Sequence, residues 1–123
     1  MIQPFRETVL EIVVTERDAI TVVAIKGSVD SLNADQLTAA FAEPIQQGHV
    51  RLVADFGAVT YTSSAGLRSL LATVKDCRRQ GGDLRIAALQ PQVERVLSIS
   101  GFTSIIKTFA DRDTAVDSFK APA

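Results

Sequence analysis

The sequence predicts an α/β domain with a mixed, mostly parallel β-sheet flanked by about four helices. Short runs of β-branched residues alternate along the chain with amphipathic stretches, as in parallel strands joined by right-handed helical crossovers. The first two strand-like runs follow one another directly, which adds an antiparallel hairpin. The expected order is β-β-α-β-α-β-α-β-α over 123 residues.

The composition indicates one soluble domain that spans residues 1–123, with its core at about residues 9–119. Hydrophobic residues make up 46% of the chain and charged residues 22%, which excludes disorder as the main state. A formal net charge of −1 lacks the positive field of a nucleic-acid-binding protein, so no nucleic-acid partner is predicted. Every apolar run is far shorter than the roughly 18–20 residues that cross a bilayer, so no membrane insertion is predicted.

The chain has 1 Cys and 1 His, too few for an internal disulfide or a Cys/His zinc site. We therefore predict no metal and no cofactor. A chain without disulfides fits a reducing compartment, and residues 1–6 lack the basic and apolar segments of a signal peptide. These observations favour a cytoplasmic protein.

The first half of the chain predicts a hairpin followed by a helix. Residues 9–15 are rich in β-branched side chains, a turn follows at Arg17-Asp18, and residues 19–26 are apolar enough for a strand buried on both faces. Residues 27–33 form a polar loop, and Asn33 is expected to cap a helix. The apolar stripe of that helix is Ala34, Leu37, Phe41 and Ile45, with Gly48 as its stop.

Pro44 lies within this helical stripe. Because proline removes a helical hydrogen bond, we expect a kink or an early end there.

The middle of the chain predicts a strand at residues 50–56, a turn at residues 57–62, and a second helix. Ser63-Ser64 begins that helix, which runs to about Gln80, and Gly81-Gly82 ends it. Its inward face comprises Leu67, Leu70, Leu71, Val74 and Cys77.

The last third predicts a strand at residues 84–89, a helix opened by Pro91 and ended by Gly101, a short strand at residues 105–109, and a helix at residues 111–119. The side chains expected to point inward from these two helices are Val93, Val96, Leu97, Ala115, Val116 and Phe119.

Two adjacent serines stand where the second helix begins. Serine is a favoured N-cap, worth about 1 kcal/mol over alanine, which accounts for one of them. Capping does not account for Ala65 and Gly66, since glycine is a poor choice in a first helical turn. Small residues there leave the backbone open to close approach by another group.

A serine hydrolase is a second interpretation of this turn. The run from Thr62 to Gly66 differs by one residue from a G-x-S-x-G nucleophile elbow, and it lies between a strand and a helix. His49, however, precedes the serines, whereas α/β-hydrolases have the order Ser, acid, His. The hydrolase interpretation is therefore strongly disfavoured.

Four segments together resemble the STAS domain family, and within it the bacterial anti-sigma factor antagonists. The segments are Gly27-Ser28-Val29-Asp30, Val53-Ala54-Asp55-Phe56, the run from Val59 to Leu67, and the run from Gln90 to Leu97 leading to Ser100-Gly101-Phe102. The third segment is similar to the family's phosphorylation loop, D-S-S/T-G-L. Their order and spacing cover nearly the whole chain.

The resemblance places the family's phosphoacceptor serine at Ser64, with Ser63 as the fallback. The preceding family position, usually Asp, is Ser63 here, and the following Ser/Thr position is Ala65. The loss of the Asp removes a negative charge beside the acceptor and leaves two candidate hydroxyls.

The resemblance also implies a partner-binding surface around Ser64. The residues it assigns to that surface are Asp30, Ser31, Ser63, Ala65, Gly66, Leu67 and Arg68. Asp30 is equally well interpreted as a turn or cap residue. Arg68 is either a solvated charge or a partner for an acidic surface or for a phosphate on Ser64, one helical turn away.

Three further polar residues are expected to be structural. Asp55 is predicted to bond into the next turn, Cys77 to be buried and inert, and His49 to lie in a surface loop.

The resemblance implies a regulatory protein and not an enzyme. Its unphosphorylated form would bind an anti-sigma factor that is also a GHKL-type serine kinase, freeing a sigma factor. Phosphorylation would release it, and a phosphatase would reset it. The alternative is a STAS scaffold subunit, without phosphorylation, in a stressosome-like or lipid-transport assembly. The oligomeric state is expected to be a monomer or a weak dimer.

Overall fold

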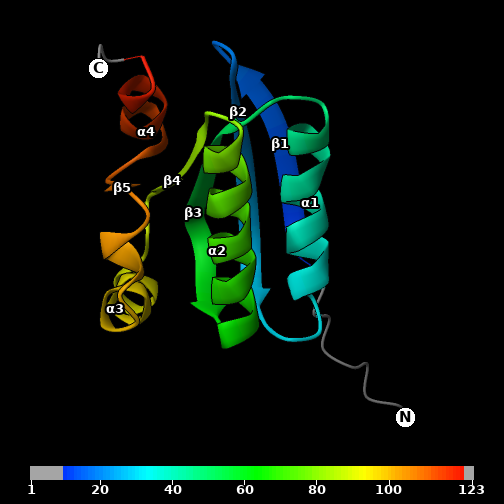
Figure 1. Ribbon diagram of the computed structural model, residues 1–123. Helices are drawn as coiled ribbons and strands as arrows, with labels where there is room; N and C mark the ends of the chain where they lie inside the picture. Colours follow the sequence, from blue (N-terminus) through cyan, green and yellow to red (C-terminus); the bar gives the residue numbers. More distant parts are fainter. Residues whose placement is uncertain (1–9, 121–123) are drawn as a thin grey trace.

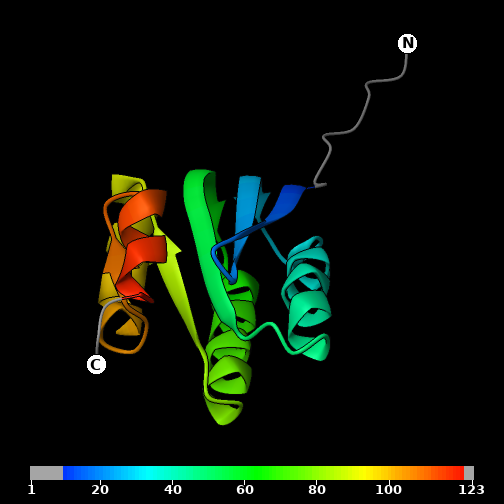
Figure 2. The ribbon, with the colours of Figure 1, turned by 90° about the horizontal axis from the view of Figure 1, so that it is seen from above.

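The computed structural model describes residues 10–120, which form a five-stranded sheet with helices against both faces (Figures 1 and 2). The strands are β1 (Glu11–Arg17), β2 (Ile20–Val29), β3 (Arg51–Thr62), β4 (Asp83–Ala87) and β5 (Thr108–Phe109). The helices are α1 (Ala34–Gln46), α2 (Ser64–Arg79), α3 (Pro91–Ile99) and α4 (Arg112–Ser118), with a 3₁₀ turn at Phe102–Ser104.

The strand order is β1-β2-β3-β4-β5, with β1 antiparallel to β2 and every later pair parallel. Helices α1 and α2 cover one face of the sheet, while α4 packs on the other (Figure 2). This confirms the predicted mixed sheet, the order of the elements and the four helices. Two apolar clusters result, a large one beneath α1, α2 and α3 and a smaller one beneath α4.

The predicted hairpin is present, but its turn lies one residue later than the predicted Arg17-Asp18, because Arg17 still pairs with Ile20. Residue 9 lies outside the described residues. The turn residues Asp18 and Ala19 have φ values of 55° and 69°, which is the backbone of a two-residue turn that matches strand twist. From Ile20 to Val23 every residue of β2 is buried, as expected of a strand covered on both faces.

The predicted loop at residues 27–33 and turn at residues 57–62 are wrong in extent. The β2–β3 ladder continues in parallel as far as the Val29↔Thr62 pair, with register shifts after Ala24 and after Gly27. Val29 and Val59 are fully buried in the core. The irregular pairing accommodates residues that break the strand pattern while the backbone stays hydrogen-bonded, so sheet pairing overrides local turn propensity.

Several helix and strand details also differ from the predictions. Asn33 occupies the N-cap position of α1, but its side chain makes no capping bond. Helix α1 continues through Pro44 to Gln46. The strand at residues 84–89 ends at Ala87, because the next residue, Ala88, has a φ of 64°.

The final strand comprises only Thr108–Phe109 and not the predicted residues 105–109. Residues 105–107 connect it to the preceding 3₁₀ turn. Val96 is 37% exposed and therefore does not point inward. Phe119 is half-buried, beneath the Arg85 guanidinium at 4.0 Å from the ring centroid.

Within residues 10–120, no helix combines the length and apolar character that a membrane crossing requires. Cys77 lies on the inner face of α2 and is fully buried, as predicted. Burial raises the pKa of its thiol to about 11, because desolvation disfavours the thiolate.

We expect the Cys77 thiol of the folded protein to resist alkylation by iodoacetamide at pH 8, since the thiolate is the nucleophile. Its reaction should be at least roughly 100-fold slower than that of glutathione in the same buffer, because it requires local opening. Mass spectrometry over time measures the rate, and addition of urea should abolish the protection. A native rate equal to that of glutathione would contradict the buried position.

Candidate functional site

The predicted phosphorylation loop lies where β3 ends and α2 begins, at the carboxyl end of the parallel strands (Figure 1). The Ser63 backbone N–H donates to the Val29 carbonyl at 2.8 Å. This bond holds the start of α2 against the end of β2. Asp30 and Ser31 follow Val29 directly, so the structure brings the two predicted loops together.

Gly66 is buried in the first turn of α2, and its neighbours explain why it is glycine. An added Cβ would overlap Thr62 Oγ1 and would lie 2.8 Å from Val29 Cγ1. Both neighbours are β-branched and stiff about χ1, so neither moves aside easily. The close approach that the small residue suggested is therefore made by the protein's own β2 and β3.

The two serines have different roles in the structure. Ser63 is the N-cap of α2: its Oγ accepts the Gly66 N–H at 3.4 Å, and the residue is half-buried. Ser64 is the first helical residue and is exposed to solvent. Within residues 10–120, no hydrogen bond engages the Ser64 hydroxyl.

Asp30 organises the loop between β2 and α1. Its carboxylate accepts the N–H groups of Leu32 at 2.8 Å and Asn33 at 3.1 Å, and its carbonyl accepts the Ala34 N–H at 3.0 Å. The Asn33 side chain receives the Asp30 N–H at 2.9 Å and donates to the Ser28 carbonyl at 2.8 Å. These contacts match the turn-residue interpretation of Asp30, and Asn33 braces the loop from within.

The other predicted partner-binding residues divide between surface and interior. Ser31 and Arg68 are exposed and Ala65 is half-buried, whereas Gly66 and Leu67 are buried. Ser31, Arg68 and Ala65 therefore offer side-chain surface beside the exposed Ser64. Gly66 and Leu67 instead anchor the helix beneath that surface.

Two exposed apolar side chains near the loop were not predicted from the sequence. Leu32 is 78% exposed in the β2–α1 loop, and Tyr61 is 52% exposed at the end of β3. The sequence feature that could have indicated Tyr61 is its position in the predicted phosphorylation-loop motif, two residues before Ser63. The predicted turn at residues 57–62 concealed that it faces away from the core.

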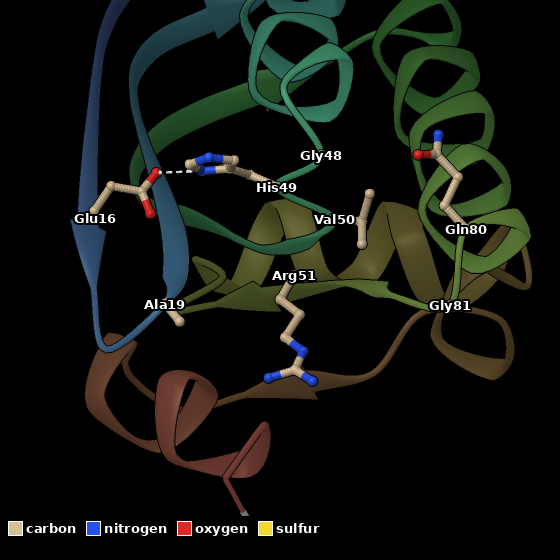
Figure 3. A pocket seen from close by; sticks show the side chains of 8 residues that line it. All are labelled: Glu16, Ala19, Gly48, His49, Val50, Arg51, Gln80 and Gly81. Carbon is tan, nitrogen blue, oxygen red and sulfur yellow. Dashed lines mark hydrogen bonds and ion pairs between the residues drawn. The ribbon is translucent and has the colours of Figure 1, made fainter.

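The opposite end of the sheet carries a hollow of about 450 Å³ between the β1–β2 turn and the loops that precede β3 and β4. There His49 Nδ1 lies 3.2 Å from Glu16 Oε2 (Figure 3). In Figure 3 the side chains of Arg51 and Gln80 point away from this pair, so the polar groups do not converge. His49 is exposed, as predicted for a surface loop.

The geometry does not support a serine hydrolase. His49 precedes β3 and Ser64 follows it, so a strand of 12 residues separates them, about 40 Å at strand rise. His49 therefore cannot take a proton from Ser64 in this fold.

Asp55 in β3 has a structural role. Asp55 accepts the Gly57 N–H at 2.9 Å and pairs with Arg112 Nε at 2.8 Å. The predicted structural bond to the following residues is present, although Gly57 belongs to β3 and not to a turn. Among residues 10–120, no group of three or more His, Cys, Asp or Glu side chains is placed to hold a metal ion.

The fold defines a small α/β domain with a mixed five-stranded sheet, and comparison with known families identifies it. The model of the STAS domain family matches residues 11–115, so the chain belongs to that family. The resemblance seen in the sequence is thereby confirmed.

The chain is 40% identical over 103 residues to a candidate anti-sigma factor antagonist named BtrV from Bordetella bronchiseptica, covering 84% of this chain and 89% of that protein. A crystal structure of an anti-sigma factor antagonist from Mycobacterium paratuberculosis has a TM-score of 0.84 at 24% identity, covering 91% of this chain and 95% of that one. Unphosphorylated SpoIIAA, an anti-sigma factor antagonist, has a TM-score of 0.76 at 19% identity, covering 93% and 98%. The two structures share the fold.

We expect Gly66→Ala to lower the free energy of unfolding by about 1–3 kcal/mol, because the new methyl group overpacks a rigid site. Urea denaturation followed by circular dichroism measures the change. Ser64→Ala is the matched control: it alters an exposed side chain in the same helical turn and should change stability by at most about 0.5 kcal/mol. Equal stability of the two variants would contradict the close packing described here.

Proposed function

We propose that this protein is an anti-sigma factor antagonist that binds a GHKL-type anti-sigma factor serine kinase while Ser64 carries a free hydroxyl. Binding would free a sigma factor, and phosphorylation of Ser64 by the kinase would end the binding. The observation that carries this proposal is the exposed, unengaged Ser64 hydroxyl at the first position of α2. The names of relatives such as BtrV support the antagonist class.

The structure favours Ser64 over Ser63 as the phosphoacceptor. Ser63 is half-buried, and its Oγ caps the helix by accepting the Gly66 N–H. Its phosphorylation would disturb that cap, and substitution of such caps costs about 1 kcal/mol. Ser64 presents its hydroxyl to solvent without loss of any internal bond. A kinase active site therefore reaches Ser64 without unfolding the loop.

A phosphate on Ser64 would be compatible with the fold. It adds about −1.5 to −2 charges and three acceptor oxygens at the positive end of the α2 dipole. The first turn of α2 contains no acidic residue that would repel it. The switch therefore acts at the interface, where a buried phosphate without partners costs several kcal/mol, enough to change affinity by orders of magnitude.

The proposed contact surface joins the β2–α1 loop to the start of α2. Ser31, Ala65 and Arg68 contribute accessible surface around Ser64, with Ser63 at its edge. Asp30 contributes through the shape of its loop, in addition to any charge that it offers a partner. Gly66 and Leu67 hold the helix in place below the surface.

The proposal assigns no catalysis to this chain, which is the substrate of the kinase and of a resetting phosphatase. We place the protein in the cytoplasm, where sigma factors act, as one STAS domain in a monomer or weak dimer. The proposed function requires no cofactor, no nucleic acid and no membrane insertion.

Incubation of the purified protein with GHKL-type serine kinases of the same genome and Mg-ATP tests the proposal. We expect one phosphate per chain, located at Ser64 by mass spectrometry. Ser64→Ala should accept none, whereas Ser63→Ala, the matched control, should still be phosphorylated. Ser64→Asp should weaken kinase binding at least roughly tenfold, because it places a charge in an interface built for a hydroxyl.

Each other result excludes part of the proposal. Detection of the phosphate on Ser63 would show that Ser63, and not Ser64, is the phosphoacceptor. The protein would be a STAS scaffold subunit if no kinase phosphorylates it and if Ser64→Asp leaves its assembly with partner proteins intact. Ester turnover that is lost in Ser64→Ala would indicate a hydrolase.

A further inference from the structure

The solvent-facing side of α2 continues from Ser64 as a basic stripe, which we define as Arg68, Ala72 and Lys75. These residues follow Ser64 at intervals of four, four and three, so they share one face of the helix. All three are exposed, whereas Leu70, Val74 and Cys77 on the other side are buried. The stripe is about 16 Å long from Ser64 to Lys75 at the rise of an α-helix.

The two cations of the stripe have no acidic partner among residues 10–120. The neighbouring arginines of α2 are engaged: Arg78 Nε pairs with Asp83 at 2.9 Å, and Arg79 pairs with Asp76. Arg68 and Lys75 therefore present two uncompensated positive charges on a chain whose formal net charge is −1.

The exposed charges of the adjacent helix have the opposite sign. Helices α1 and α2 lie side by side on one face of the sheet (Figures 1 and 2), joined by a Thr38–Ser69 hydroxyl bond of 2.8 Å. The exposed charged residues of α1 are Asp35 and Glu43. An acidic surface approaching this layer is therefore attracted to α2 and repelled by α1, which fixes its orientation.

We propose that the basic stripe docks an acidic surface of the kinase that phosphorylates Ser64, an inference that rests on the function proposed above. A kinase whose active site closes on the Ser64 hydroxyl must cover the first turns of α2. Arg68 lies one turn from that hydroxyl and Lys75 three turns. The contact surface thus extends beyond the phosphorylation loop to Lys75, a residue that the motif does not include.

The stripe also gives phosphorylation a second effect, which is cancellation of charge. Arg68 and Lys75 together carry two positive charges, and a phosphate on Ser64 adds about −1.5 to −2 at the end of the same stripe. The net charge that the acidic surface meets falls to nearly zero. Because Arg68 is four residues from Ser64, its guanidinium can also turn to the phosphate and leave the partner.

Association kinetics of Lys75→Glu with the phosphorylating kinase, over a series of salt concentrations, test this inference. We expect the association rate at low salt to fall about fivefold to tenfold and its salt dependence to weaken, since surface charges act mainly on the encounter step. Lys26→Glu is the matched control, with the same charge change on an exposed β2 side chain of the opposite sheet face. Its association rate should stay within about twofold of wild type.

The outcomes separate the two proposals. If Lys75→Glu associates with the kinase as fast as wild type, the proposal that the basic stripe docks the kinase is wrong, and the proposed function is unaffected. Equal slowing by Lys26→Glu also overturns the docking proposal, because net charge alone would then account for the effect. A wild-type protein that no GHKL-type kinase binds or phosphorylates overturns both. Circular dichroism of each variant confirms that the fold is retained.

Discussion

The close packing of Gly66 against Val29 and Thr62 is the constraint on which the candidate site depends. It brings the first turn of α2 onto the ends of β2 and β3, and the Ser63 N–H bond to Val29 fixes the same junction. With Ser63 committed to the cap and Gly66 to the interior, the Ser64 side chain is left facing solvent. The exposure of the Ser64 hydroxyl therefore follows from burial of its neighbours, and a larger residue at position 66 would disturb both.

The length of β3 separates the two ends of the molecule chemically. One end gathers the carboxyl ends of β2 and β3, the Asp30 loop and the start of α2. The other holds His49 and Glu16, whose pairing at 3.2 Å occupies the chain's one imidazole. A serine near a strand end acts as a nucleophile only with a base in reach, and the sheet holds that base a full strand away. The fold thus leaves Ser64 without a histidine base in reach.

Much of the fold was predictable because the strong hydrophobic periods of α2 and of β2 dominate their segments. The extent of β2 and β3 was not, since Gly27, Gly57 and Thr60 suggest turns and only pairing between strands distant in sequence keeps them extended. The location of the candidate site was predictable from the motif, because Ser63 and Ser64 begin α2 as expected. Its phosphorylation stays a prediction. The bracing of the loop by Asn33 was not predictable from the sequence. An Asn before a helix indicates an N-cap, and only the structure shows that its side chain bonds to Asp30 and Ser28 instead.

The phosphorylation switch proposed at Ser64 would work without a change of fold, and this would determine where its specificity resides. Ser64 carries its hydroxyl at the start of α2, where the helix dipole would also favour a phosphate, so the two states of the proposed switch would share one backbone. The difference between them is then confined to charge and bulk on the surface that a partner covers. On a chain of formal net charge −1 no broad field masks that difference. Under the two proposals, Arg68 and Lys75, the cations that follow Ser64 on the same helical face, would determine how strongly one phosphate alters the charge that a partner meets.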